Sequence, residues 1–159
     1  VTHVMDTKII VIWVGLLLAV FAYKKWYSEA LFLGSNLVLT ALLVLLLKNI
    51  YQRPRPSILH LVEEKGFSFP SGHSLASTLV LGSLIIIISQ HVKNKTARYC
   101  LQGLLVLGIV TIVVSRVYVG VHYPSDVLGS MILGLAVLQF EYPLYDRLRF
   151  QWRFTGKQK

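Results

Sequence analysis

Charged residues and cysteine are both scarce in this sequence. Only 14% of its 159 residues are charged and 55% are hydrophobic, whereas soluble domains carry roughly 25% charged residues. The composition therefore excludes an ordinary soluble domain. The single cysteine, Cys100, excludes an internal disulfide. Its place in an apolar run favours a buried structural thiol over a reactive one.

Acidic residues are also few. Seven acids stand against sixteen basic residues, which gives a net charge of +9 at pH 7. Such a charge would suit a nucleic-acid partner, but the basic residues punctuate apolar stretches and form no continuous basic face. We therefore expect no nucleic-acid binding.

Long apolar runs make up most of the chain. They have no polar stripe, which predicts membrane-spanning helices and not helices on the membrane surface, although each run is slightly short of the roughly 20 residues that cross a bilayer. We expect an all-α, polytopic transmembrane helical bundle that forms a single domain over residues 1–159. The five expected spans are Lys8–Tyr23, Glu29–Leu47, Ser74–Gln90, Ala97–Ser115 and Asp126–Leu144.

The five spans divide the basic residues unequally between the two membrane faces. The face with more Lys and Arg is expected to be cytoplasmic. This predicts a multi-pass protein of the cell membrane whose first span begins outside, and we expect an upstream helix to precede it. The inner face holds Lys24, Lys25, Lys93, Lys95, Arg98, Arg147, Arg149, Arg153, Lys157 and Lys159, and the outer face holds Lys8, Lys48, Arg53, Arg55, Lys65 and Arg116.

Three polar segments lie on the outer face. They are KNIYQRPRP (Lys48–Pro56), SFPSGHS (Ser68–Ser74) and SRVYVGVHYPSD (Ser115–Asp126). Because the chain returns to the same face each time, the three segments should converge. We name them the first, second and third polar segments.

Three cations of these segments lack matching acids. Lys48, Arg55 and Arg116 are expected at the edge of an apolar bundle. Cations gathered without carboxylates predict an anionic ligand, and arginine suits phosphate through its fork of donors. The outer-face acids that fall outside the three segments are Asp6, Glu63 and Glu64.

The second polar segment has the pattern of a helix start. Pro70 suits the first helical position, where its missing N–H costs nothing. The backbone N–H groups of Ser71 and Gly72 would then be free to bind a phosphate oxygen. His73 follows in the first turn, beside that phosphate.

The third polar segment predicts an oriented histidine. Pro124 again suits a helix start, with His122 just before it and Asp126 in the first turn. The carboxylate is then placed to accept a hydrogen bond from one imidazole nitrogen, which leaves the other nitrogen free to attack. Together the segments supply what phosphoryl transfer requires.

Each residue taken alone also has a structural interpretation. A lysine at a span end such as Lys48 often only extends its amine toward water, and PSGH can be merely a helix cap. We interpret His3, His60 and His91 as structural, and Arg53 as a charge at the rim. The joint occurrence of three segments that suit one anion favours a functional site.

The three segments resemble the signature of the type 2 phosphatidic acid phosphatases, a superfamily that also includes vanadium haloperoxidases. The signature reads K-x6-R-P, then P-S-G-H, then S-R-x5-H-x3-D. It is found here at Lys48–Pro56, Pro70–His73 and Ser115–Asp126, with no departure from the pattern.

This resemblance implies a metal-independent lipid phosphatase without a cofactor. His122 would attack phosphorus and form a phosphohistidine, Asp126 would orient it, and His73 would protonate the leaving oxygen and then activate water. The phosphate would be held by Lys48, Arg55, Arg116 and the backbone at Ser71 and Gly72.

The expected substrate is a lipid phosphate at the outer leaflet. The family resemblance and the outward site suit undecaprenyl diphosphate or phosphatidylglycerol phosphate, with phosphatidic acid as a further possibility. Vanadate-dependent halide oxidation and non-catalytic anion binding or transport are the alternatives. The His122–Asp126 pair favours turnover over binding, because binding alone needs no nucleophile. We expect the loop from Ser57 to Ser68 to be too short for a substantial lid.

Overall fold

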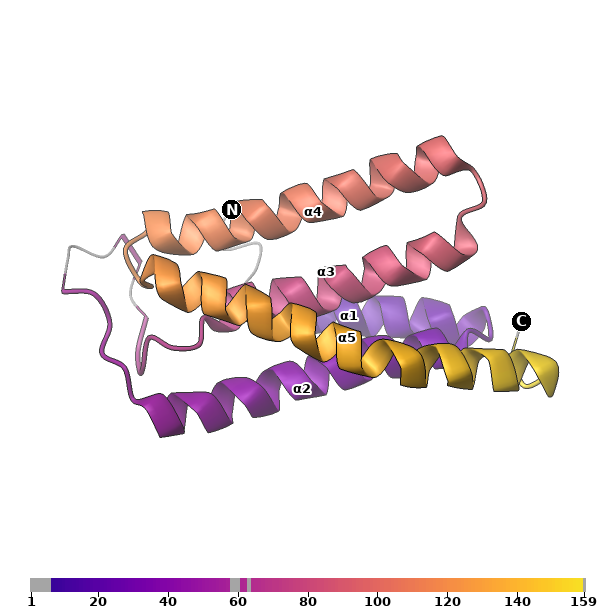
Figure 1. Cartoon of the computed structure of the whole chain (residues 1–159), viewed down its shortest axis with the longest axis horizontal. Coiled ribbons are helices and arrows are strands. Elements are labelled where there is room, and N and C mark those ends of the chain that lie inside the picture. The colour runs from indigo at the N-terminus through magenta and orange to yellow at the C-terminus, as the bar shows by residue number, and fades with distance from the viewer. Residues whose placement is uncertain (1–6, 58–60, 63, 159) are drawn as a thin grey trace.

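The chain folds into a bundle of long helices (Figure 1). The computed structural model describes residues 7–57, 61–62 and 64–158, and regular structure within these ranges is helical. This confirms the all-α prediction. The helices are α1 (Thr7–Tyr23), α2 (Tyr27–Tyr51), α3 (Gly72–His91), α4 (Lys95–Tyr118) and α5 (Pro124–Phe154).

Four of these helices, α2 to α5, are long and apolar enough to cross a membrane. The fifth, α1, contributes a shorter apolar stretch, Val11–Tyr23. The helices are longer than the expected spans: α2 has 25 residues, α4 has 24 and α5 has 31. The expected spans end where hydrophobicity ends, but backbone hydrogen bonding continues through the polar residues beyond them. Lys48 and Arg116 therefore lie in the last turns of α2 and α4.

Helix α3 is the centre of the bundle. Of the 18 most apolar consecutive residues of α3, 56% are buried, whereas the corresponding share is 22% in each of α2, α4 and α5. It packs against all three of these helices. Leu75 and Leu79 are fully buried, and the hydroxyls of Thr78 and Ser83 donate to backbone carbonyls one turn earlier, so they cost little to bury.

The two ends of the bundle differ in content. One end holds the α2–α3 loop and the α4–α5 turn, and the other holds the α1–α2 turn, the α3–α4 loop and the C-terminus (Figure 1). At the second end the fully buried carboxylate of Glu29 lies 2.8 Å from His91 Nε2 and 3.7 Å from Arg153. Trp26 stacks on His91. This cluster joins α2, α3 and α5 far from the three polar segments.

Some expectations about single residues are settled by the helix packing. Cys100 is exposed, so the expectation of a buried thiol is wrong. The reason is that α4 packs mainly on α3 and turns its other faces away from the bundle. His3 and His60 lie outside the described residues.

A close contact between α3 and α5 limits substitution at Gly134. A Cβ atom there would lie 2.8 Å from Cγ2 and 2.9 Å from Cβ of Thr78, whose side chain is stiff and buried. We expect Gly134→Ala to push the helices apart and to lower the free energy of unfolding by about 1–3 kcal/mol. Thermal unfolding in detergent, followed by circular dichroism, measures this.

The control is Gly103→Ala on α4, where nothing lies within 4 Å of the added Cβ. Its unfolding midpoint should equal or exceed that of the wild type, since alanine favours the helix. Equal midpoints for the two variants would contradict the packing argument.

Candidate active site

The three polar segments meet at one end of the bundle, as expected from the return of the chain to one face (Figure 1). His73 and Asp126 lie in the first turns of α3 and α5, and Arg116 lies in the last turn of α4. Arg116 and Asp126 are at most 1% exposed. Charges buried so deeply in an apolar bundle require partners.

The carboxylate of Glu64 lies at the centre of the site. Its Oε2 is 3.1 Å from Arg55 Nη2 and its Oε1 is 3.3 Å from Arg116 Nη1. Oε1 also lies 3.8 Å from His73 Nδ1, and Oε2 lies 3.9 Å from His122 Nε2. The expectation that this acid stands apart from the cations is therefore wrong.

Glu64 is ionised at neutral pH. Burial raises the pKa of its carboxyl, but His73, Arg55, His122 and Arg116 together lower it further, so the pKa lies below its ordinary value. Asp6 and Glu63, the other acids set aside with it, lie outside the described residues.

Arg55 holds the α2–α3 loop over the site. Its Nε donates to the Gly66 carbonyl at 3.0 Å and its Nη2 to the Lys65 carbonyl at 3.2 Å. Its Nη1 donates to the carbonyl of Val121 in the α4–α5 turn at 2.8 Å. The loop thus reaches into the site at Glu64. Residues 58–60 and 63 of this loop lie outside the described residues, so the expectation of little lid stays a prediction; the described part places the Glu64 side chain at the pocket.

His122 lies in the tight turn between α4 and α5. Gly120 adopts a left-handed backbone conformation (φ 79°) that reverses the chain just before it. The His122 side chain is 1% exposed. Its Nε2 faces Glu64, whereas its Nδ1 faces Asp126 Oδ2 at 3.8 Å, beyond hydrogen-bond distance.

The imidazole of His122 is neutral at physiological pH. Burial, together with the positive charge of Arg55, lowers its pKa to about 4, against the opposing effect of Glu64 and Asp126. A neutral imidazole has a free lone pair and is able to act as a nucleophile.

Asp126 is held by groups other than His122. Its fully buried carboxylate accepts hydrogen bonds from Arg53 Nη1 at 2.6 Å, from the Tyr123 backbone N–H at 3.0 Å and from the Ser68 hydroxyl. The expected hydrogen bond to His122 is absent in this state. Arg53 also lies over the Tyr123 ring, 4.3 Å from its centroid. The Arg53 side chain is 39% exposed, which agrees with a place at the rim, but it also pairs with Asp126, because a buried carboxylate needs a cation.

The start of α3 departs from expectation in two details. The helix begins at Gly72 with Ser71 as its N-cap, so Pro70 precedes the helix and does not open it. The Ser71 N–H donates to Ser130 Oγ at 2.9 Å and is not free for a ligand. Gly72 remains at the edge of the site. The expected start of α5 at Pro124 is confirmed.

An apolar groove runs from the site along α1, α2 and α3. It has a volume of about 790 Å³. Lys48, Glu64, Gly72 and His73 line its polar end. The rest of its lining is supplied by Val11, Leu37, Val38, Thr40, Ala41, Val44, Leu45, Lys65 and Ala76.

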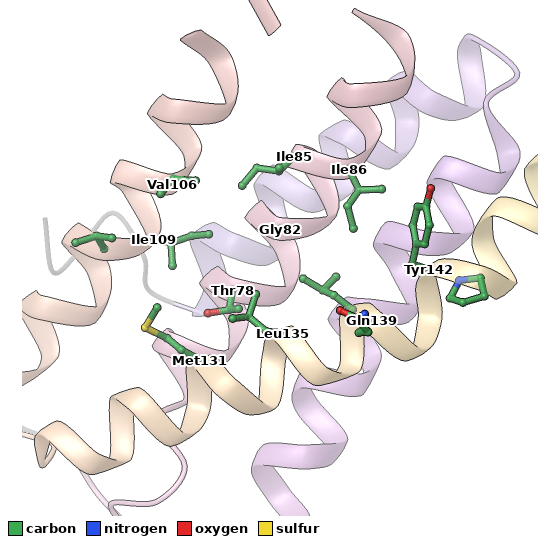
Figure 2. Close-up of a pocket in the computed structure, with 13 residues that line it drawn as sticks. Thr78, Gly82, Ile85, Ile86, Val106, Ile109, Met131, Leu135, Gln139 and Tyr142 are labelled. Carbon is green, nitrogen blue, oxygen red and sulfur yellow. The ribbon is translucent and has the colours of Figure 1, made fainter. Parts of the chain in front are cut away.

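A second cavity lies between α3, α4 and α5 (Figure 2). It measures about 680 Å³ and contains none of the candidate site residues. Its lining is apolar apart from Thr78, Gln139 and Tyr142. Within the described part of the chain, no group of three or more His, Cys, Asp or Glu side chains is placed to hold a metal ion.

Residues 29–150 match the PAP2 superfamily. The chain belongs to this superfamily. The matched range contains all three polar segments, so the family pattern and the assembled site are the same part of the molecule.

Similar proteins and a solved structure agree with this assignment. The chain is 37% identical to phosphatidylglycerophosphatase B of Bacillus subtilis over 122 residues, which cover 72% of this chain and 57% of that protein. It is 31% identical to undecaprenyl-diphosphatase BcrC of Bacillus subtilis over 147 residues, 88% of this chain and 71% of that protein. It superposes with a TM-score of 0.83, at 26% identity, on the crystal structure of a transmembrane PAP2-type phosphatidylglycerolphosphate phosphatase from Bacillus subtilis, covering 92% of this chain and 73% of that one.

Sequence reasoning missed Arg53, Ser68 and Glu64 as members of the site. Arg53 and Ser68 both lie inside polar segments and touch Asp126. Glu64 lies between the first two segments. The sequence feature that could have indicated it is an acidic residue in the loop that connects two segments rich in cations.

The low pKa of His122 predicts a pH dependence of stability. Between the ordinary value of 6.5 and about 4 the unfolded chain binds a proton that the folded chain does not. Acidification from pH 7 to pH 5 therefore favours unfolding through this residue. His122→Gln lacks the effect, so its thermal midpoint should fall less than that of the wild type over the same range. Equal falls would show that His122 is not held neutral by the fold.

Proposed function

We propose that this protein is an integral-membrane lipid phosphatase that hydrolyses a phosphate monoester or diphosphate through a phosphohistidine intermediate. One observation carries the proposal: Arg55, Arg116, His73 and His122 surround a single anion at the end of an apolar groove. The anion in the structure is the carboxylate of Glu64, and a lipid phosphate would take its place.

The first step uses the neutral imidazole of His122. Its Nε2 faces the anion and attacks phosphorus, and the bond from phosphorus to the lipid oxygen breaks. His73 protonates that leaving oxygen. Arg55 and Arg116 stabilise the charge that develops on the other phosphate oxygens.

The second step returns the site to its starting state. His73 accepts a proton from water, the water oxygen attacks phosphorus, and the bond from phosphorus to His122 Nε2 breaks to release inorganic phosphate. Asp126 lies 3.8 Å from His122 Nδ1 and favours the cationic imidazole of the intermediate through its charge. Lys48, at the polar end of the groove, and Gly72 would contact the bound phosphate. Ser71 supports Gly72 by capping α3.

The substrate class follows from the groove and from the similar proteins. An apolar groove that ends at a cationic site suits a lipid whose chain lies among the helices and whose phosphate lies at the membrane edge. Undecaprenyl diphosphate and phosphatidylglycerol phosphate are the first candidates, followed by phosphatidic acid. The greater number of Lys and Arg at the opposite end of the bundle favours an outward-facing site in the plasma membrane.

Replacement of His122 by alanine tests the mechanism. We expect phosphate release from lipid substrates in detergent to fall by at least a thousandfold in His122→Ala, since no other group supplies the nucleophile. Release by the wild type should persist in EDTA. Cys100→Ala, on the exposed face of α4, should retain full activity. Release that survives in His122→Ala would refute the mechanism, and anion binding without any release by the wild type would favour a carrier.

Arg53 is expected to act as a positioning residue through Asp126. Arg53→Ala should lower kcat about tenfold or more with little change in KM, because Arg53 contacts the carboxylate and not the phosphate. Arg53→Lys should restore part of kcat, since it keeps the charge. Arg98→Ala, at the start of α4 in the other end of the bundle, is the matched control. A change confined to KM would assign Arg53 to substrate binding instead.

A further inference from the structure

The carboxylate of Glu64 occupies the binding site, where it balances the positive charge of the surrounding side chains. Its two oxygens are shared among both arginines and both histidines that the proposed mechanism assigns to the phosphate. These four groups come from the α2–α3 loop, α3, α4 and the α4–α5 turn. No other part of the described chain brings an anion to them all.

The loop around Glu64 keeps this carboxylate close to the site. Arg55 binds the carbonyls of Lys65 and Gly66, the two residues that follow it. The Glu64 side chain is 21% exposed, so it lies at the mouth of the pocket and is not enclosed. A tethered group of this kind competes with free ligands at a high effective concentration, about millimolar for short flexible tethers. A displaced Glu64 carboxylate would still have cations near it, because Lys48 and Lys65 line the groove beside it.

We propose that Glu64 is a specificity-determining residue, whose carboxylate occupies the phosphate pocket and must be displaced by the substrate, so that only strongly bound anions enter. This inference rests on the proposed phosphatase function. It concerns which lipids gain access to the site and not the chemistry of hydrolysis.

The physical basis is a threshold on affinity. If the site is open for only a tenth of the time, every anionic ligand binds about tenfold more weakly than to a permanently open site. The factor is the same for all ligands, but its consequence differs. A tightly bound ligand still saturates the site, whereas a weakly bound one no longer does.

Charge separates the two kinds of lipid phosphate that meet this site. A phosphate monoester carries about −1.5 to −2 charges at pH 7 and has three free oxygens for the surrounding donors. A phosphodiester, the linkage of bulk phospholipids, carries a single charge and has two free oxygens. It gains little over the single charge of Glu64 that it must displace. The carboxylate thus protects the site from the phosphodiesters that surround it in the membrane.

Glu64→Gln removes the charge and nearly preserves the shape. We expect inorganic phosphate to bind the resting variant about tenfold more tightly than the wild type in isothermal titration calorimetry. With a lipid that the wild type hydrolyses, KM and the inhibition constant of phosphatidylglycerol should both fall by that same factor. At subsaturating substrate, a phosphatidylglycerol concentration below the wild-type inhibition constant should therefore remove a larger fraction of the variant's activity than of the wild type's.

Two further variants make the result decisive. Glu64→Ala should tighten phosphate binding in the same direction, and tighter binding cannot arise from misfolding. Asp146→Asn removes a carboxylate that is 45% exposed on α5 and paired with Arg149, and it should leave phosphate binding unchanged.

Equal phosphate affinity in Glu64→Gln and the wild type would overturn the proposal, as would a loss of kcat with unchanged inhibition by phosphatidylglycerol. Because the calorimetric measurement needs no turnover, it tests Glu64 even if no lipid is hydrolysed. Absence of hydrolysis by the wild type would count against the phosphatase function alone.

Discussion

The burial of charge at one end of an apolar bundle is the constraint on which the site depends. Arg116 is 1% exposed and Asp126 is fully buried, and neither tolerates such a position without an opposite charge. Arg116 is paired with Glu64 and Asp126 with Arg53. Each pair joins the α2–α3 loop to the last or first turn of a long helix, so satisfying the charges also closes the loop over the pocket.

The two ion pairs serve different parts of the proposed chemistry. The pair of Asp126 with Arg53 is reinforced by Ser68 and the Tyr123 backbone, which makes it a fixed element beside His122. The pair of Arg116 with Glu64 has longer contacts and lies at a partly exposed mouth. A ligand phosphate offers the same arginines a higher charge, so this pair is the one that substrate can replace. In the proposed mechanism, a rigid support and an exchangeable anion thus lie on either side of His122.

The rest of the bundle positions these groups without taking part in the chemistry. Helix α3 is central and rich in small residues, and its contact with α5 at Gly134 brings the first turns of both helices together. The cluster of Glu29, His91 and Arg153 fastens the other end. Because both ends are fastened through charge, the helices between them can remain apolar where they face lipid. The groove that leads to the site lies along one such face.

Much of this could be predicted from the sequence, and for physical reasons. Hydrophobic runs predict spanning helices because lipid accepts no unsatisfied backbone, and alternation of spans puts the three polar segments on one face. Spacing within one segment is local, so the sequence correctly predicts that a helix begins at Pro124 with Asp126 in its first turn. The helices extend past the expected span ends because backbone hydrogen bonding continues beyond the apolar residues, so α5 reaches Phe154.

The sequence by itself determined the helical bundle, the convergence of the polar segments and the histidines and cations that belong to the family pattern. Only the tertiary structure decided which acidic side chain pairs with which arginine. Glu64 reaches Arg116 across 52 positions of chain and Arg53 reaches Asp126 across 73. Such pairings depend on how the loop folds back over the bundle, and they are chosen by the cost of leaving a buried charge alone, a quantity that no local pattern of residues contains.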